Sequence, residues 1–213
     1  MNQPDTIKVW DPLLRFFHWA LVLLFIISFA TGEDESIIHI WSGYGVAGLI
    51  VFRLLWGLIG PKYARFSNFI YSPQDILVYG RGLFDGSAKR YLGHNPLGGL
   101  MVVALLLSLS MASLTGMMLY GAEEAKGPLA SVMQAENKIV LPQLISTAQA
   151  DDDEDHEYRG GESEVLEESH EFFANLSILL IVFHLVGVLF ESLFHRESLI
   201  RSMFNGYKRT DLR

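Results

Sequence analysis

Two histidines of the last apolar segment, His170 and His184, stand fourteen residues apart. In an α-helix, fourteen residues make four turns less about 40° and rise about 21 Å, so both rings project from one side. At the 3.5 residues per turn of a left-handed bundle, the two rings line up. One helix can therefore present ligands at two depths, which suits two stacked metal cofactors. Haem is the natural candidate, because imidazole is a common axial ligand of haem iron.

Two earlier apolar segments each offer one more histidine, His18 and His39. A lone histidine near a membrane face is more often an interfacial or hydrogen-bonded residue than a ligand. Four of them in two pairs favour a functional role. Depth along the helices suggests that His18 pairs with His184 and that His39 pairs with His170.

The sequence contains other possible iron ligands, which are methionines and three further histidines. The third segment holds the methionines Met101, Met111, Met117 and Met118. Methionine in an apolar helix usually packs, so bis-histidine ligation is favoured over methionine ligation. The remaining histidines are expected at an interface or in solvent: His94, His156 and His195.

The elements that must position these ligands are membrane helices. The chain has 213 residues, of which 50% are hydrophobic. Its mean hydropathy of +0.27 is high for a soluble domain of ordinary charge content. Four stretches approach the roughly 20 residues that span a bilayer, at about 13–31, 37–60, 96–121 and 170–194. The expected fold is an all-α integral membrane protein, a bundle of four transmembrane helices in one domain over 1–213.

The distribution of charge predicts the orientation of this bundle. Basic residues gather before the first span, between the second and third, and after the fourth, whereas the connection 122–168 contains the acidic run Asp151 to Asp155. Because lysine and arginine are retained on the cytoplasmic side, both termini are expected in the cytoplasm. The third and fourth helices are then joined by a long acidic periplasmic loop over 122–168. This topology predicts a multi-pass protein of the bacterial inner membrane, in contact with lipid.

Two features of composition narrow the chemistry. The sequence contains no cysteine, which excludes thiolate-bound iron–sulfur clusters, covalent haem and disulfides, and leaves histidine as the main strong ligand. The formal net charge of -8 argues against a nucleic-acid partner.

Local signals place helix starts and candidate cofactor contacts. Asp11 followed by Pro12 predicts the start of the first helix. An amphipathic helix at the membrane interface is expected to start near Pro73. Arg53 lies inside the second apolar stretch, where it either pairs with a haem propionate or extends to the cytoplasmic interface. Arg15 is a further candidate for the cofactor.

Small residues follow His39 within about two helical turns and form a smooth face: Gly43, Gly45, Ala47 and Gly48. A flat macrocycle could lie against this face, and Gly43 is the candidate contact. Ordinary close packing of helices through small residues explains the same pattern equally well.

Several segments together resemble one known family. They are Val9-Trp10-Asp11 with Phe17-His18-Trp19, His39 to Tyr44, Phe52 to Gly57, His94 to Gly99, and Phe183-His184 with His195-Arg196-Glu197. The chain resembles the prokaryotic cytochrome b561 family, which includes the b-type cytochrome subunits of nickel–iron hydrogenases. The resemblance covers nearly the whole chain except Ala122 to Glu168.

The resemblance implies four helices that hold two non-covalent b haems, with His18 and His184 on one haem and His39 and His170 on the other. It also implies electron exchange between quinone and a redox partner. The function expected is that of a di-haem cytochrome b, which carries electrons across the membrane between the quinone pool and a periplasmic redox protein. That partner is expected to be a c-type cytochrome or a reductase or hydrogenase subunit.

Two other classes of function remain open from the sequence. One is a self-sufficient oxidoreductase that passes electrons from a small substrate such as superoxide to quinone. The acidic outer connections would repel such an anion and attract a basic protein. The other is a haem-free transporter with histidines as proton relays. Whether the chain is an enzyme on its own is therefore not decided, although an electron-transfer subunit fits better.

Overall fold

The computed structural model describes residues 6–32, 36–136 and 153–210, of which 135–136 and 153–162 are described as backbone only. The chain forms two compact units. Unit 1 consists of residues 1–107 and 177–213, and unit 2 of residues 108–176. The expectation of a single domain over 1–213 stays a prediction.

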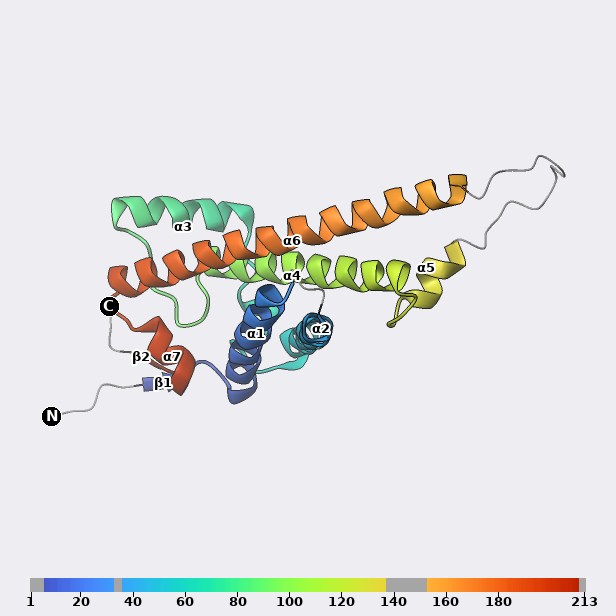
Figure 1. The fold of residues 1–213 in the computed structure, drawn as a ribbon. Helices are drawn as coiled ribbons and strands as arrows, with labels where there is room; N and C mark the ends of the chain where they lie inside the picture. The colour runs from blue at the N-terminus through green and yellow to red at the C-terminus, as the bar shows by residue number, and fades with distance from the viewer. Residues whose placement is uncertain (1–5, 33–35, 137–152, 211–213) are drawn as a thin grey trace. The chain divides into compact units, whose positions relative to one another are not determined.

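The described chain is mostly helical (Figure 1). The helices are α1 (Pro12–Ala30), α2 (Ile37–Ile59), α3 (Pro73–Asp85), α4 (Pro96–Glu123), α5 (Ala130–Glu136), α6 (Asp153–Phe194) and α7 (Leu199–Asn205), with a short 3-10 helix η1 (Phe66–Asn68). Four of them are long and apolar enough to cross a membrane: α1, α2, α4 and the part Ser163–Phe194 of α6. The four predicted spans are thereby confirmed as helices.

The predicted loop over 122–168 was wrong in part. Helix α4 continues to Glu123, α5 follows at Ala130–Glu136, and α6 already begins at Asp153, well before the predicted start at 170. A helix that is already nucleated by a long apolar span extends at little cost through residues with good helix propensity, such as the many glutamates here. Asp151 and Asp152 lie outside the described residues.

The predicted helix starts are confirmed. The Asp11 side chain accepts hydrogen bonds from the backbone N–H groups of Leu13 and Leu14, each at 3.0 Å, and Pro12 is the first helical residue. At the start of α3, Ser72 and Asp75 form a capping box in which each side chain accepts from the other residue's backbone N–H. Whether α3 lies at a membrane interface stays a prediction.

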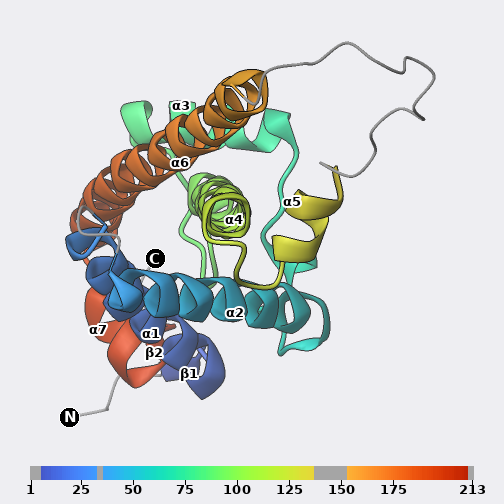
Figure 2. The same cartoon turned by 45° about the vertical axis from the view of Figure 1, so that its right-hand side comes forward.

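Unit 1 is built on the pair α1 and α2, which lie side by side in Figures 1 and 2. Its buried core consists of Val9, Trp10, Leu14, Phe17, Ala64 and Leu106. Gly45 belongs to the contact between the two helices, because a Cβ at this position would come within 2.7 Å of Leu24 Cδ1. This glycine therefore serves close packing.

A small two-stranded sheet ties the start of α1 to the end of the chain. Strand β1 (Thr6–Lys8) pairs antiparallel with β2 (Tyr207–Arg209). The N–H groups of Val9 and Trp10 both donate to the carbonyl of Gly206, at 2.9 and 3.1 Å. The Trp10 indole also donates to Ser202 of α7 at 3.3 Å. These contacts fix the start of α1, whose first two turns carry Arg15 and His18.

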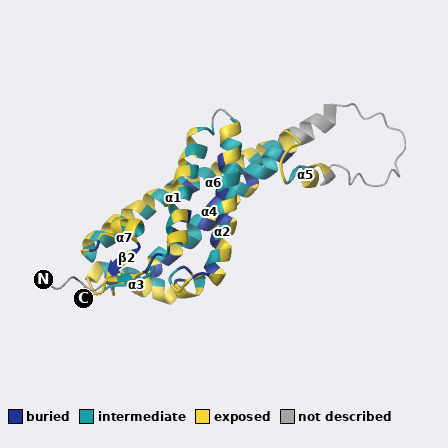
Figure 3. Ribbon diagram, turned by 90° about the horizontal axis from the view of Figure 1, so that it is seen from below, coloured by how far each residue is buried: buried dark blue, intermediate teal, exposed yellow. Residues whose placement is uncertain are grey.

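Large apolar side chains are exposed along the helices, and the ribbon of Figure 3 is yellow, the colour of exposed residues, along much of their length. Leu58 and Ile59 of α2 are 69% and 79% exposed, and Leu193 of α6 is 79% exposed. Exposed apolar area on this scale is unfavourable in water, whereas hydrocarbon accommodates it. The surface therefore fits a lipid environment.

Candidate functional site

His39 projects from the first turn of α2, which Ser36 caps by accepting from the His39 N–H. Its ring atom Nδ1 lies 2.8 Å from the carbonyl oxygen of Ser28 on α1. A carbonyl only accepts, so Nδ1 must carry the proton and donate it. The lone pair is then on Nε2, the tautomer that a histidine needs in order to bind a metal through Nε2.

His170 shows the same arrangement inside unit 2. Its Nδ1 lies 2.9 Å from the carbonyl oxygen of Ala112 on α4, and the Thr115 hydroxyl is 3.5 Å from the same atom. Gly116 makes the close approach of this ring to α4 possible, because a Cβ there would come within 2.9 Å of His170 Cε1. The sequence analysis missed Gly116. Its signal would have been a glycine inside an apolar helix.

His18 and His184 both belong to unit 1, on α1 and on the C-terminal half of α6. Both are half-buried, and they lie close enough for their charges to interact. The His18 ring meets Trp19 edge-on, with 5.0 Å between ring centroids. His18 Nδ1 is buried and has no hydrogen-bond partner among the described residues. The structure thus places both residues in one unit, and their pairing on one haem stays a prediction.

The pairing of His39 with His170 stays a prediction, because the two residues belong to different units. What the structure shows for each is its own surroundings. Both rings are held at Nδ1 by a helix carbonyl, so both present the same tautomer.

Arg53 of α2 does not extend to an interface. It is 2% exposed, and its guanidinium lies over the rings of Phe66 and Phe69, at 4.8 and 5.6 Å from their centroids. Its Nη1 is buried and has no hydrogen-bond partner within the described part of the chain. A buried guanidinium with an unpaired N–H fits an anionic group such as a haem propionate.

The two other candidate cofactor residues also lie in unit 1. Arg15 donates from Nη1 to the carbonyl of Phe204, and its buried Nε has no partner among the residues described. A Cβ at Gly43 would meet no atom within 4 Å, and the same holds for Gly48. Gly43 therefore leaves room beside α2 for a flat ring, in contrast to Gly45.

His94 does not stand free in solvent, and whether it lies at an interface stays a prediction. Its ring packs between Trp10 and Phe69, with centroid distances of 4.9 and 4.6 Å. Burial lowers the pKa of His94 to about 3, and the charges of Arg53 and other nearby cations act in the same direction. Its Nδ1 is buried and has no hydrogen-bond partner in the described structure. His94 is thus a neutral, half-buried neighbour of Arg53 that sequence reasoning missed.

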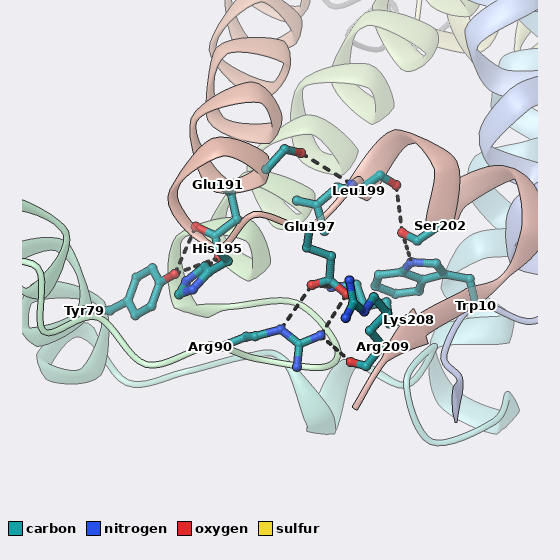
Figure 4. Close-up of polar contacts among 11 residues, drawn as sticks. Trp10, Tyr79, Arg90, Glu191, His195, Glu197, Leu199, Ser202, Lys208 and Arg209 are labelled. Carbon is teal, nitrogen blue, oxygen red and sulfur yellow. Dashed lines mark hydrogen bonds and ion pairs between the residues drawn. The ribbon is translucent and has the colours of Figure 1, made fainter. Parts of the chain in front are cut away.

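A polar cluster lies at the end of α6 in unit 1 (Figure 4). Glu197 is 8% exposed and pairs with Arg90 at 2.8 Å and with Lys208 at 3.8 Å. Burial lowers the pKa of Lys208, while Glu197 raises it. Beside this group, Glu191 accepts from the Tyr79 hydroxyl and lies 3.3 Å from His195 Nε2.

These residues fit haem better than a metal ion held by protein ligands alone. No group of three or more histidine, cysteine or carboxylate side chains gathers as a metal site within the described ranges. A porphyrin supplies the four equatorial ligands of its iron, so the protein needs to supply only two imidazoles. Imidazoles, a buried guanidinium with an unpaired N–H and an open glycine face are what such a group requires.

Apolar spanning helices and imidazole ligands of this kind define a membrane haem protein. The family model for prokaryotic cytochrome b561 matches residues 9–206, and the chain belongs to this family. No curated protein and no solved structure matches the chain. The protein is therefore a haem b electron-transfer protein that crosses the inner membrane several times. This confirms the family resemblance and removes the haem-free transporter from consideration.

Proposed function

We propose that the chain binds two b haems, one through His18 and His184 and the other through His39 and His170. The observation that carries this proposal is the shared surroundings of His39 and His170, whose Nδ1 atoms both donate to a helix carbonyl. Second partners of this kind orient metal-binding imidazoles and fix their tautomer. The proximity of His18 and His184 within unit 1 supports the other pair.

The haem iron supplies one-electron redox chemistry, and the protein binds, orients and insulates it. Two imidazoles complete the coordination, which leaves no open position for a small ligand such as oxygen. Arg53 and Arg15 neutralise the propionate charge at the His18 and His184 site. The apolar surfaces of the helices exclude water, so the electron is transferred without competing reactions.

The proposed electron path joins the quinone pool to a periplasmic redox protein, with both termini of the chain in the cytoplasm. The support is the distribution of lysine and arginine, which are concentrated at the ends assigned to the cytoplasm. A reporter fused after Arg213 or within 81–90 should report cytoplasm, and one between α5 and α6 should report periplasm. An exported C-terminus would exchange the inner and outer assignments.

The partner we propose is a basic protein, either a c-type cytochrome or a reductase or hydrogenase subunit. The acidic run Asp151 to Asp155 precedes a stretch of α6 in which Glu164, Glu167 and Glu168 are exposed. Opposite charges raise association rates until salt screens them beyond roughly 8 Å. Neutralising the run with Asn and Gln should slow electron transfer to the native partner and flatten its salt dependence. An unchanged rate and salt slope would show that the run only links two helices.

The decisive experiment counts haems in the purified protein. We expect two low-spin b haems per chain, both extracted by acid–acetone because no cysteine can hold them covalently. His184→Ala should remove one haem and largely spare the other, and His170→Ala should remove the other one. His195→Ala, which changes a histidine directly after the same helix and outside the pairs, should retain both haems. A content of one haem per chain contradicts the proposal.

A further inference from the structure

Glu191 stands at the centre of a group of polar side chains in unit 1 that haem ligation does not use (Figure 4). The hydroxyl of Tyr79, on α3, donates to the Glu191 carboxylate, with its oxygen 3.0 and 3.1 Å from Oε1 and Oε2. His195 places Nε2 at 3.3 Å from Oε1. A carboxylate, a phenol and an imidazole in contact are three groups that exchange protons.

The position of Glu191 on α6 relates this group to the haem ligand His184. Seven residues separate the two, which corresponds to two helical turns less about 20° and a rise of about 10.5 Å. Four residues further on, directly after the end of α6, the N–H of His195 donates to the Glu191 carbonyl at 3.0 Å. Glu191 therefore lies on the ligand-bearing face of α6, between His184 and the end of the helix.

The three groups differ in exposure. Tyr79 is 5% exposed, whereas the side chains of Glu191 and His195 are 14% and 12% exposed. Burial and the neighbouring Glu191 both raise the pKa of Tyr79, so its phenol stays protonated and donates. The phenol and His195 Nε2 are thus enclosed, while the carboxylate of Glu191 is partly exposed.

The remaining charged and titratable neighbours of Glu191 are on other elements. Lys208 of β2 is close enough to act on it electrostatically, and the ring of Tyr91 meets Tyr79 edge-on at 5.6 Å. Lys208 is also bound to Glu197, which shares its charge. Lys208 is thus the cation that these contacts place near Glu191, and extra negative charge near a carboxylate favours its protonated form.

We propose that the Glu191 carboxylate, which accepts a hydrogen bond from Tyr79 and lies beside His195, binds a proton when the haem at His18 and His184 is reduced and releases it on oxidation. This inference rests on the proposed function, because it assumes a haem at that pair. One electron reaches the haem by the electron-transfer activity, and one proton from water forms an O–H bond on Glu191. Oxidation by quinone, whose reduction consumes one proton per electron, reverses both changes.

The experiment is a redox titration of the full-length protein in lipid nanodiscs, from about pH 5 to about pH 9, where carboxyl and imidazole groups titrate. The midpoint potential of the haem that is lost in His184→Ala should fall as pH rises. In Glu191→Gln, which keeps the shape and accepts from Tyr79, at least half of this pH dependence should disappear. Tyr79→Phe should move the pH range of the effect.

Matched controls separate proton binding from simple anchoring of α3 to α6. Glu167→Gln changes an exposed carboxylate of the same helix, and Tyr71→Phe removes a hydroxyl that bonds to the His94 carbonyl instead. Both should titrate like the unmodified protein. In that protein, infrared difference spectra should show a carboxylic acid band on reduction that Glu191→Gln lacks.

The outcomes distinguish the inference from the function on which it rests. A pH-independent potential in the unmodified protein, or a Glu191→Gln variant with the full pH dependence, overturns the inference while both haems remain. Loss of neither haem in His184→Ala overturns the haem assignment itself. If Glu191→Gln does not fold, the infrared band of the unmodified protein and the Tyr79→Phe titration decide.

Discussion

The surroundings of His39 and His170 differ from those of His18 at one ring atom. In the first two residues, Nδ1 donates to a helix carbonyl at 2.8 and 2.9 Å. In His18, Nδ1 is buried and has no hydrogen-bond partner among the described residues. The protein thus sets ring orientation and tautomer in advance at His39 and His170, the proposed outer pair. At His18, which forms the proposed inner pair with His184, other contacts must do so.

What surrounds the inner pair is charge and aromatic surface. Arg53 and Arg15 each have a buried nitrogen without a partner in the described structure, and His94 is packed between Trp10 and Phe69. Buried, unpaired polar groups are unfavourable until a ligand satisfies them. At the proposed inner site, a bound cofactor would therefore satisfy polar groups that are unpaired without it. At the proposed outer site, backbone carbonyls already orient the histidines.

The largest loss of haem from the proposed outer site is expected for a substitution at Gly116. In Gly116→Ala, the new Cβ would lie within 2.9 Å of His170 Cε1, so the ring must turn away and lose its hydrogen bond to Ala112. We expect the variant to lose more than half of the outer haem and to keep the inner one, measured by haem content and spectrum. Gly187→Ala is the control, since a Cβ there meets no atom within 4 Å. Two haems at full occupancy in Gly116→Ala would show that the close approach is not required.

A similar test for the inner site removes its buried charge. Arg53→Leu should weaken binding of the inner haem by about 10- to 100-fold, because a hydrogen bond to a charged group contributes roughly 1.5–3 kcal/mol. The measurement is haem retention on dilution in detergent. Arg53→Lys should retain part of the affinity, and Arg65→Leu, which changes an exposed residue, should retain all of it. Equal loss of both haems in Arg53→Leu would contradict a local role.

The sequence predicted the positions of the membrane helices better than the contacts of the candidate ligands. Length and apolar composition located the four spans, because a bilayer imposes both on each, and the Asp11 cap located the start of the first. The start of α6 was missed, since a polar stretch continues as helix once the apolar part has formed. No local signal marks where such an extension begins.

The candidate ligands were found from spacing, but their partners were not. The Nδ1 contacts of His39 and His170 are to backbone carbonyls, which every residue has, so no side-chain pattern announces them. The structure also separates glycines that look equal in sequence, because Gly45 packs against Leu24 while Gly43 does not. Such distinctions depend on which helices are neighbours.

The comparison also predicts a difference in acid stability. Because the pKa of His94 is lowered to about 3 in the folded protein, the unfolded chain binds one more proton below about pH 6.5. The contribution of neutral His94 to the free energy of unfolding is thus complete above about pH 6.5. It falls by roughly 1.4 kcal/mol per pH unit from there down to about pH 3. The inner haem should be released before the outer one as pH falls, followed by absorption. His94→Gln should reduce the difference between the two, and identical acid release in both proteins would contradict this.

The smallest effects should come from the hydroxyl groups beside the outer histidines. The Thr115 hydroxyl donates to the Met111 carbonyl at 2.8 Å, and its oxygen is 3.5 Å from His170 Nδ1, farther than the Ala112 carbonyl at 2.9 Å. Ser28 Oγ stands in the same relation to His39, at 3.4 Å against 2.8 Å for the Ser28 carbonyl. Thr115→Val and Ser28→Ala leave both carbonyl contacts in place. Neutral hydrogen bonds of good geometry contribute about 0.5–1.5 kcal/mol, and these longer contacts should contribute less.

We therefore expect both variants to keep two haems, with changes in outer-haem affinity of less than about threefold. The measurement is again haem retention on dilution, compared with Gly116→Ala under the same conditions. A loss in Thr115→Val as large as that in Gly116→Ala would mean that the hydroxyl orients His170. The backbone carbonyl would then not be the feature that distinguishes the outer pair from the inner one.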